Sequence, residues 1–587
     1  YYTIGNTNSV LEATANNFFT TSPPTNTNRK IKILAFGDCG NNSTNQKNVR
    51  DAFLNYASTN SISLDGWLLL GDNGYNAGLD NEYTNGFFNI YESSLLKNVK
   101  VYPSPGNHDY SNNSTNQGLR NLPYYNTFSQ PTNGEIGGVP SNTHAYYSFD
   151  IGDIHFLSLD SYGRENGNTS RLYDTSGAQA TWVKADLAAN TKKFTVVFFH
   201  HPPYTKTSHN SDANGGTGEM DLVAMRERFI RILERNGVDL LICGHAHGFE
   251  RSYLLKGYYN TYASPVDETG FSFASHTATG TNQNGKYDGT LNSCSYTYNS
   301  GHYNHGTMYM VAGSAGQLGG SASGYPHNAM YYSNNTNGGS FYFEVDSNRL
   351  DAKFISYSGT GASVVPVIRD QFTIFKDVNK THNLNVTTGT PLTLTASWRG
   401  TYNWPNNGGA ATQAVNIANA SNGNFVYTVR DDNTCLQDVF NVTVASGPVP
   451  ITLASFSANL DNNQVLLDWV TSQEQNNKFF TIEKSNDGTN YSFWGKVDGA
   501  GNSSIEKSYR LIDYAPAEGI NYYRLSQTDF DGHVKYLGVK TINYQTHNGF
   551  NATIRNNGNG KISVVINSLT ATQIAMKVVE LMGNDVL

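Results

Sequence analysis

The chain of 587 residues carries little charge: Lys, Arg, Asp and Glu make up 15% of it, and the formal net charge is −8. This mildly acidic balance gives no support for a nucleic-acid partner or an anionic membrane surface, both of which select basic patches. No apolar run reaches the roughly 18 residues of a transmembrane helix, so no membrane span is expected. Neutral polar residues, glycine and tyrosine are abundant instead, as is common in exported β-rich proteins.

Cysteine is also scarce, with only Cys39, Cys243, Cys294 and Cys435 in the chain. Four widely spaced cysteines exclude a dense disulfide framework, and the lack of a CxxC pair excludes a metal knuckle of that type. Cys39 and Cys243 each follow a predicted strand, so they could lie close together. We expect buried free thiols at these two positions.

The length exceeds what one hydrophobic core usually serves, so several domains are expected. Residues 1–30 are polar and end in a Pro/Thr/Asn-rich stretch, which indicates an N-terminal leader or linker. The chain opens at Tyr1 without methionine and shows no signal peptide, so we expect that a leader has been removed.

From Ile31 the sequence alternates short apolar runs with helix-spaced segments. Helical spacing of apolar residues over 49–57 and 222–233 predicts two helices, the second ended by Gly237. Apolar runs predict buried strands at residues 31–36, 67–70, 101–102, 154–159, 194–199, 240–243 and 308–313. This alternation indicates an α/β domain with sheets covered by helices.

Five short polar motifs directly follow predicted strands. They are Gly37-Asp38-Cys39-Gly40, Gly71-Asp72-Asn73-Gly74-Tyr75, Gly106-Asn107-His108-Asp109, His200-His201-Pro202 and Gly244-His245-Ala246-His247. Taken singly, each is more often a turn or an internally hydrogen-bonded loop. Because ligands gather at the carboxyl ends of strands in open α/β sheets, the five together are expected to converge on one site.

The side chains in these motifs are carboxylate, phenol, amide and imidazole. Such a mixture can hold two cations about 3.5–4 Å apart, the spacing of two-metal hydrolases. Asp72 is the natural candidate for a carboxylate that bridges the pair. Hard oxygen ligands combined with imidazole suit iron, manganese or zinc, whereas thiolate sites favour softer metals.

The set of motifs resembles that of the purple acid phosphatases, within the calcineurin-like metallophosphoesterases. Most members of the wider superfamily begin with Asp-x-His, but here Gly40 stands in place of that histidine and Tyr75 follows Asp72 by three residues. The resemblance covers roughly residues 31–375. It implies a catalytic domain over residues 31–376, an α/β (α+β) sandwich of two mixed β-sheets flanked by helices.

The resemblance also implies two sets of metal ligands. A ferric site would use Asp38, Asp72, Tyr75 and His247, and a divalent site, for Fe, Zn or Mn, would use Asp72, Asn107, His200 and His245. A phenolate is a hard anionic ligand that favours Fe(III). Of the adjacent histidines, His200 is preferred as ligand because it directly follows strand 194–199, which leaves His201 to packing or substrate contact.

Other groups are expected to handle the substrate. His108, beside Asn107, resembles the family histidine that contacts phosphate, and Asp109 is expected to orient it. His209, nine residues after His200, stands where a family histidine aids protonation of the leaving group, or it is an exposed loop histidine.

The polar stretch 252–306 is long enough to cover a site or to be disordered, and substrate specificity is expected to depend on such loops. It contains His302 and His305, which are weaker candidates for a catalytic role. Glu250 and Arg251, just before it, are expected to form a structural ion pair.

After residue 376 the helical periodicity disappears. Residues 377–447 resemble an immunoglobulin-like β-sandwich, with Tyr402-Asn403-Trp404 and the run 427–435, and residues 448–546 resemble a fibronectin-III-like β-sandwich, with Asp468-Trp469 and Tyr522-Tyr523-Arg524-Leu525. Residues 547–587 resemble the start of a type IX secretion sorting domain, although the Asn-Pro usual near its beginning is missing. The type IX machinery would then be a partner, and the protein would be secreted or held at a bacterial cell surface.

The function implied is a secreted acid phosphatase. A metal-bound hydroxide would attack the phosphorus of a phosphomonoester, and His209 or His108 would protonate the departing alkoxide. Two alternatives stay open: a phosphodiesterase or nucleotide pyrophosphatase on the same site, and a cell-surface binding protein with a vestigial metal domain. The natural substrate, the divalent metal and the oligomeric state cannot be derived from the sequence.

Overall fold

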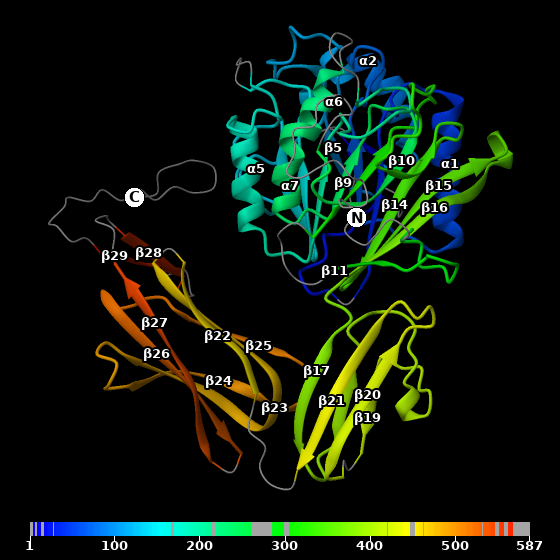
Figure 1. Ribbon diagram of the computed structural model, residues 1–587. Helices are drawn as coiled ribbons and strands as arrows, with labels where there is room; N and C mark the ends of the chain where they lie inside the picture. The colour runs from blue at the N-terminus through cyan, green and yellow to red at the C-terminus, as the bar shows by residue number, and fades with distance from the viewer. Residues whose placement is uncertain are drawn as a thin grey trace.

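The computed structural model describes residues 17–545, together with residues 4–5, 9–12, 551–556 and 562–567. Within the long range it leaves out residues 28, 166–169, 213–218, 260–283, 299–304, 419–420, 446–451, 462 and 531. An α/β part lies at the top of Figure 1, and two all-β parts lie beneath it. Among the helices in the described ranges, none has the length and apolar character needed to span a bilayer.

The α/β part contains two seven-stranded mixed sheets. The first has the order β11-β16-β15-β14-β3-β4-β5, with β3, β4 and β5 parallel to one another. Its strands are β3 (Ile31–Phe36), β4 (Gly66–Leu70), β5 (Val101–Ser104), β11 (Tyr296–Tyr298), β14 (Gly339–Asp346), β15 (Arg349–Ser358) and β16 (Val365–Lys376).

The second sheet has the order β13-β10-β12-β9-β8-β7-β6, in which β7, β8, β9 and β12 are parallel neighbours. Its strands are β6 (Tyr147–Ile151), β7 (Ile154–Ser158), β8 (Phe194–Phe198), β9 (Leu240–Cys243), β10 (Phe249–Leu255), β12 (Thr307–Ala312) and β13 (Met330–Asn334). The predicted sandwich of two mixed sheets is therefore confirmed.

The central strands are buried on both faces, which explains why they are continuous apolar runs rather than alternating ones. In β3, Ile33 and Ala35 belong to the core between the two sheets, whereas Leu34 and Phe36 belong to the core beneath the helices. Side chains from both sheets make up the first of these cores, so the sheets pack face to face. Loops that leave the carboxyl ends of the two sheets can therefore meet.

Helix α1 (Thr44–Thr59) illustrates how the helices cover the first sheet. Ser43 caps its first turn by accepting a hydrogen bond from the Gln46 N–H at 3.0 Å, and Val49 and Phe53 are buried against the sheet. The helix expected over 222–233 runs as α6 (Met220–Ala224), a π-helical turn (Met225–Phe229) and α7 (Ile230–Arg235), and Gly237 follows at φ +70°. The other α-helices of the described residues are α2 (Asp80–Glu82), α3 (Asn89–Tyr91), α4 (Pro123–Thr127) and α5 (Ala178–Ala189).

The rest of the chain is built from strands. In the first all-β part β17 (Thr381–Thr387), β21 (Gln437–Ala445) and β20 (Gly423–Arg430) form one sheet, and β18 (Leu392–Thr395) and β19 (Ala414–Ile417) form another. The second part contains β22 (Thr452–Asp461), β23 (Gln464–Ser485), β24 (Ser492–Ser503), β25 (Lys507–Asp513), β26 (Gly519–Asp529) and β27 (Val534–Tyr544).

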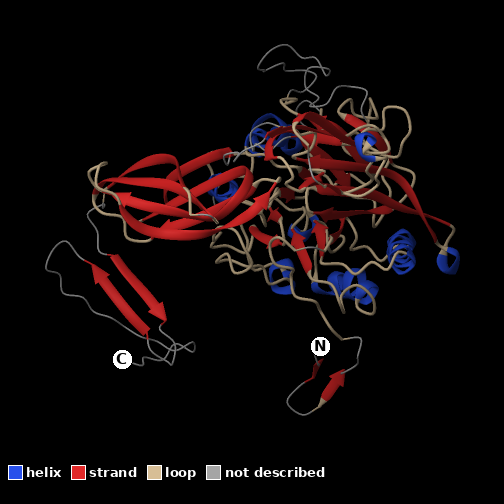
Figure 2. Ribbon diagram, turned by 90° about the horizontal axis from the view of Figure 1, so that it is seen from below, coloured by secondary structure: helices blue, strands red, loops and turns tan. Residues whose placement is uncertain are grey.

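Two hairpins lie near the chain ends, β1 (Ile4–Gly5) with β2 (Val10–Glu12) and β28 (Asn551–Asn556) with β29 (Ile562–Asn567). In Figure 2 each is set apart from the larger sheets. The domain boundaries and the secretion-tail resemblance stay predictions. Residues 446–451, which include the predicted boundary between the two β-sandwiches, and most of residues 547–587 lie outside the described residues.

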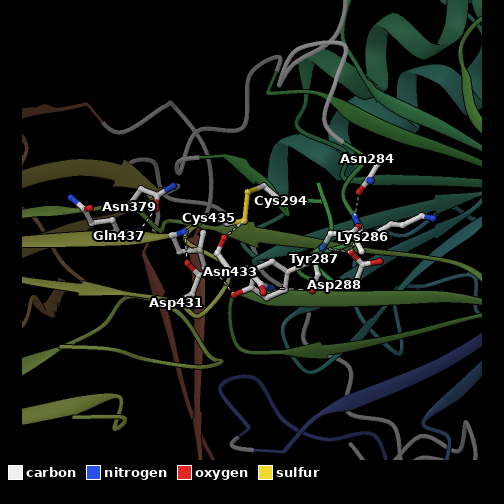
Figure 3. Close-up of a disulfide and its surroundings, with 12 residues drawn as sticks. Asn284, Lys286, Tyr287, Asp288, Cys294, Asn379, Asp431, Asn433, Cys435 and Gln437 are labelled. Atoms are coloured by element: carbon white, nitrogen blue, oxygen red, sulfur yellow. Dashed lines mark hydrogen bonds between the residues drawn. A yellow bond between two sulfur atoms is a disulfide. The ribbon is translucent and has the colours of Figure 1, made fainter. Parts of the chain in front are cut away.

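A disulfide joins the α/β part to the first all-β part. Cys294 and Cys435 are bonded across 141 residues of sequence, with their Cα atoms 5.3 Å apart (Figure 3). Next to it, the Tyr287 hydroxyl donates to Asp431 at 2.9 Å, and the Asn433 amide donates to the Tyr287 carbonyl at 3.4 Å. This bridge was not predicted from the sequence, whereas the buried free thiols expected at Cys39 and Cys243 are confirmed.

Candidate metal centre

The five motifs converge where the carboxyl ends of strands from both sheets meet. Asp38, Asp72 and Asn107 follow β3, β4 and β5 of the first sheet, whereas His200 and His245 follow β8 and β9 of the second. The prediction that strand-end loops would meet is thus confirmed by the geometry, although the role of each residue as a ligand stays a prediction.

Three of the predicted ligands, Asp38, Asp72 and His247, surround the phenol of Tyr75, and we refer to these four residues together as the Tyr75 group. The Tyr75 hydroxyl lies 3.0 Å from Oδ1 of Asp38, 3.0 Å from Oδ2 of Asp72 and 3.5 Å from Nε2 of His247. His247 Nε2 also lies 3.5 Å from Oδ1 of Asp38. Two carboxylates, a phenol and an imidazole therefore face a common point.

A second set, Asp72, Asn107, His200 and His245, is referred to as the Asn107 group. Asn107 Oδ1 lies 3.0 Å from Nε2 of His200 and 3.1 Å from Nδ1 of His245. His200 Nε2 is also 3.1 Å from Oδ2 of Asp72, and the ligand atoms of Asp72, His200 and His245 all lie within 4.8 Å of one another. The same oxygen, Asp72 Oδ2, thus belongs to both groups.

The two aspartates divide their oxygens between the centre and the backbone. Asp72 turns Oδ2 inward while Oδ1 accepts a hydrogen bond from the His108 N–H at 2.8 Å. Asp38 turns Oδ1 inward while Oδ2 accepts from the His245 N–H at 2.9 Å. Each carboxylate is therefore held in place by the loop that carries another predicted site residue.

The donor arrangement at His200 suits a cation. His200 Nδ1 lies 2.8 Å from the carbonyl oxygen of Leu70, and because a carbonyl only accepts, Nδ1 must carry a proton. In the neutral ring Nε2 then directs a lone pair at two oxygen acceptors, on Asp72 and Asn107. Burial alone would lower the pKa of His200, but the Asp72 carboxylate raises it to about 9. The site attracts a positive charge that a metal ion can supply.

Burial and neighbouring charges also shift the pKa values of Asp72 and Tyr75, the other groups that face the centre. Burial would raise the pKa of the Asp72 carboxyl, but His200 and His108 hold it below its usual value. Burial, followed by the carboxylates of Asp38 and Asp72, raises the pKa of the Tyr75 phenol well above its usual value. A phenolate at this position therefore requires a cation beside it, and carboxylate, phenolate and imidazole suit iron, zinc or manganese.

The backbone is strained where these ligands are presented. Asp38, Asp72 and His245 have φ values of +59°, +54° and +66°, a region that residues other than glycine rarely adopt. Gly106 allows the close packing next to them, because a Cβ there would lie 2.2 Å from Oδ1 of Asp72. The conformational cost is concentrated at the loops that meet.

The two histidines predicted to handle substrate lie at the open side of the centre. His108 packs against Tyr75 with the rings tilted and their centroids 4.6 Å apart, and His209 stacks on His245 at 3.9 Å. Their side chains are 24% and 31% exposed, whereas His200 is fully buried. The exposed imidazoles can therefore reach a ligand from solvent.

The expectation that Asp109 orients His108 is wrong. Asp109 does not orient the His108 ring, whose Nδ1 is instead 2.6 Å from the carbonyl oxygen of Asn76. Asp109 is buried, accepts from the N–H groups of Asn73 and Gly106, and so ties two motif loops together. Burial and the nearby Asp72 raise the pKa of Asp109 to about 7.

His201 faces away from the open side of the centre. Its side chain is buried, its Nδ1 lies 2.9 Å from the Ser161 hydroxyl, and its ring stacks against Tyr162. The ring centroid is 4.4 Å from that of His245. This places His201 in the packing that supports the centre.

The remaining weaker candidates lie away from the centre. Arg251 pairs with Asp370 rather than with Glu250, whose carboxylate accepts from the Thr205 hydroxyl, because neighbours in a strand point to opposite faces of the sheet. His305 lies 3.5 Å from Asp239 and stacks on Tyr298 near the amino ends of the strands. His302 and residues 260–283 of the long polar stretch lie outside the described residues.

Several contacts to the site were not predicted from the sequence. Glu219 lies 3.3 Å from Nδ1 of His209, and Glu82 accepts from the N–H groups of Ala77 and Leu79 in the loop after Tyr75. Gln317 and Ser208 both contact His247. These residues come from segments with no recognisable motif, so no local signal identifies them.

Comparison with known proteins agrees with this geometry. Residues 31–249 match the family of calcineurin-like phosphoesterases. Purple acid phosphatase 15 of Arabidopsis thaliana is 29% identical over 184 residues, covering 31% of this chain and 30% of the relative. Purple acid phosphatase 22 of the same plant is 35% identical over 127 residues, covering 21% and 25%.

Among solved structures, a purple acid phosphatase from yellow lupin seeds matches with a TM-score of 0.41 at 14% identity, covering 61% of this chain and 56% of that one. The chain thus spans less than a third of the length of the two sequence relatives. Residues 31–249 are thus similar in sequence to the calcineurin-like phosphoesterases, and the sequence relatives of this part of the chain include purple acid phosphatases.

Proposed function

We propose that the protein is a two-metal acid phosphatase that hydrolyses phosphomonoesters. The observation that carries this proposal is the position of Asp72 Oδ2, which lies 3.0 Å from the Tyr75 hydroxyl in one ligand group and 3.1 Å from His200 Nε2 in the other. A single oxygen shared by two sets of hard donors is what a pair of bridged cations needs. The Tyr75 group and the Asn107 group would each hold one ion.

Bound cations at these positions would neutralise charge on the phosphate and lower the pKa of the attacking water. The protein's own groups then orient the ester. His108, held through Nδ1 by the Asn76 carbonyl, presents Nε2 to a phosphate oxygen. His209, held through Nδ1 by Glu219, presents Nε2 toward the leaving oxygen, which it protonates as the ester bond breaks.

For the ion in the Tyr75 group we propose Fe(III), because a phenolate is a hard anionic donor that favours a highly charged cation. The ion in the Asn107 group would be divalent Fe, Zn or Mn. The test is the visible spectrum of the oxidised protein, with metal content measured on the same sample. A charge-transfer band that Tyr75→Phe abolishes supports a ferric tyrosinate, whereas a colourless protein with two divalent ions contradicts the iron assignment alone.

We also propose that the protein acts outside the cytoplasm, secreted or at the cell surface. The Cys294–Cys435 disulfide supports this, since such bonds persist in oxidising compartments. The resemblance of residues 547–587 to a type IX sorting domain suggests the export route. Cell fractionation with and without these residues tests it; equal export of both forms would remove the sorting role.

The decisive experiment compares hydrolysis of a phosphomonoester, a phosphodiester and a nucleotide pyrophosphate bond by the metal-loaded protein at acid pH. The proposal expects the monoester to have the highest kcat/KM. Preference for either of the other substrates would leave the two-metal centre intact and change the substrate class. If the loaded protein turned over none of them, the binding-protein alternative would be favoured.

A further inference from the structure

The two imidazoles that direct Nε2 into the centre are held in different ways. His200 is fully buried, and its Nδ1 is fixed by the Leu70 carbonyl at 2.8 Å. The His247 side chain is 15% exposed, and among the described contacts no backbone carbonyl from another residue binds its Nδ1. Its Nδ1 instead lies 3.2 Å from Nε2 of the side-chain amide of Gln317, a residue seventy positions away in sequence.

The backbone of His247 is held on both sides by the segment that carries Gln317 and by the loop that carries His209. The His247 N–H donates to the Ser208 hydroxyl at 2.8 Å, and its carbonyl accepts from the Gly319 N–H at 2.8 Å. A Cβ at Gly319 would lie 2.3 Å from Cβ of Ser208 and 3.1 Å from Cβ of His247. Gly319 therefore lets the two loops close tightly on this histidine.

The segment bearing Gln317 is itself anchored. The Asn45 side chain, in the first turn of α1, donates to the carbonyls of Ser314 and Ala315 at 2.9 and 3.1 Å. A Cβ at Gly316 would lie 1.9 Å from the carbonyl oxygen of Asp38, so the segment also packs against the first metal motif. Although the Gln317 side chain is exposed, it extends from a backbone with a fixed position.

We infer that Gln317 is a positioning residue that sets the ring orientation of His247 and thereby the affinity of the Tyr75 group for its metal ion. This inference rests on the proposed two-metal function. Hydrogen bonds to the outer nitrogen of a ligating imidazole fix its orientation, and their removal typically lowers metal affinity about 10–100-fold. An imidazole that binds an ion through Nε2 carries its proton on Nδ1, so the Gln317 amide would turn its end group by a half-turn and accept this proton through its carbonyl oxygen.

The test uses the full chain, first stripped of metal and then titrated with Zn²⁺ in competition with a chelator. Gln317→Met keeps the length of the side chain but cannot form the hydrogen bond, Gln317→Glu keeps an acceptor, and Ser323→Ala is an exposed control in the same loop. We expect Gln317→Met to lower the affinity for one of the two ions about 10–100-fold and to change the affinity for the other little. The affinities of Gln317→Glu should be close to those of the wild type. The melting temperature of the metal-free protein should not change, because the Gln317 side chain is exposed.

A second readout is the visible band of the iron-loaded protein, which reports the Tyr75 group directly. Gln317→Met should shift or weaken this band while Ser323→Ala should not. If wild type binds two ions and Gln317→Met leaves both affinities and the band unchanged, this inference alone is overturned. If wild type binds no metal at all, the proposed function fails and the inference fails with it.

Discussion

Oδ2 of Asp72 lies 3.0 Å from the hydroxyl of Tyr75, three residues further along the same loop. Asp72 has φ +54°, and its second oxygen is fixed by the His108 N–H. Because this oxygen belongs to both the Tyr75 group and the Asn107 group, the two groups share a ligand. Changes at this carboxylate should therefore affect both ions together, whereas changes at outer residues should affect one.

Asp72→Asn tests whether both ions depend on this carboxylate, because the substitution keeps the shape of the side chain and removes its charge. We expect both ions to be lost and kcat to fall by more than about 10³-fold, since the charge stabilisation that each ion supplies disappears. Metal analysis of the purified variant gives the stoichiometry. Asp80→Asn, at an exposed aspartate in the same loop region, is the control; an Asp72→Asn protein with two ions and normal turnover would contradict the bridging role.

His209→Ala tests the assignment of the proton donor. Because His209 is expected to protonate the leaving oxygen, alkyl phosphates, which have poor leaving groups, should lose about 10²–10⁴-fold in kcat. Aryl phosphates with acidic leaving groups need little protonation and should lose far less. Both losses are measured on one preparation, so errors in the concentration of active enzyme cancel in their ratio. Equal losses for the two kinds of substrate would argue against the role of His209 as the acid.

His155 should make the stability of the α/β part depend on pH. Its ring joins Asp150 and Asp186, each at 2.7 Å, and although burial lowers the pKa of His155, these two carboxylates raise it to about 9 from its usual 6.5. Because the folded-state pKa is the higher one, the stabilisation is complete below pH 6.5 and is lost as pH rises through 9. A shift of this size corresponds to roughly 3 kcal/mol.

The measurement is the urea-unfolding midpoint of wild type and His155→Gln at about pH 6 and about pH 10. The difference between the two proteins should be largest at the lower pH and shrink at the higher one. His144→Gln, at an exposed histidine, provides the control. A difference that stays constant across this range would show that packing, rather than charge, explains the effect of His155.

Replacing both Cys294 and Cys435 by serine should loosen the junction between the α/β part and the first all-β part. The bond closes a loop of 141 residues, and removing such a cross-link typically costs about 2–4 kcal/mol. Thermal unfolding with and without reductant measures the loss. Reductant should lower the transition of wild type and leave the double variant unchanged, since the thiols of Cys39 and Cys243 are already free.

Much of the fold follows from local pattern. The strands of the two sheets are predictable because central strands buried on both faces must be continuous apolar runs, as at residues 31–36 and 240–243. Helix α1 is predictable from the spacing of Val49 and Phe53. The candidate ligands are predictable because parallel strands bring their carboxyl ends to one edge, so that polar residues placed there must meet.

Other contacts join segments that are far apart in the chain, and no sequence pattern indicates that these segments meet. Nothing near Cys294 indicates that its partner is Cys435, because a disulfide depends on the distance between two Cα atoms after folding. Asp109 ties loops together rather than holding His108, since the chain turns its carboxylate toward Asn73 and Gly106.

The order of residues along the chain is enough to predict the strand-end motifs, the apolar cores and the types of donor available to a metal ion. The folded arrangement was needed to show that one oxygen of Asp72 is common to both ligand groups, and that Glu219 and Gln317 contact the outer nitrogens of His209 and His247. The reason is physical: residue type sets which interactions are possible, whereas atomic distances between distant segments arise only when both sheets pack and the loops close against each other.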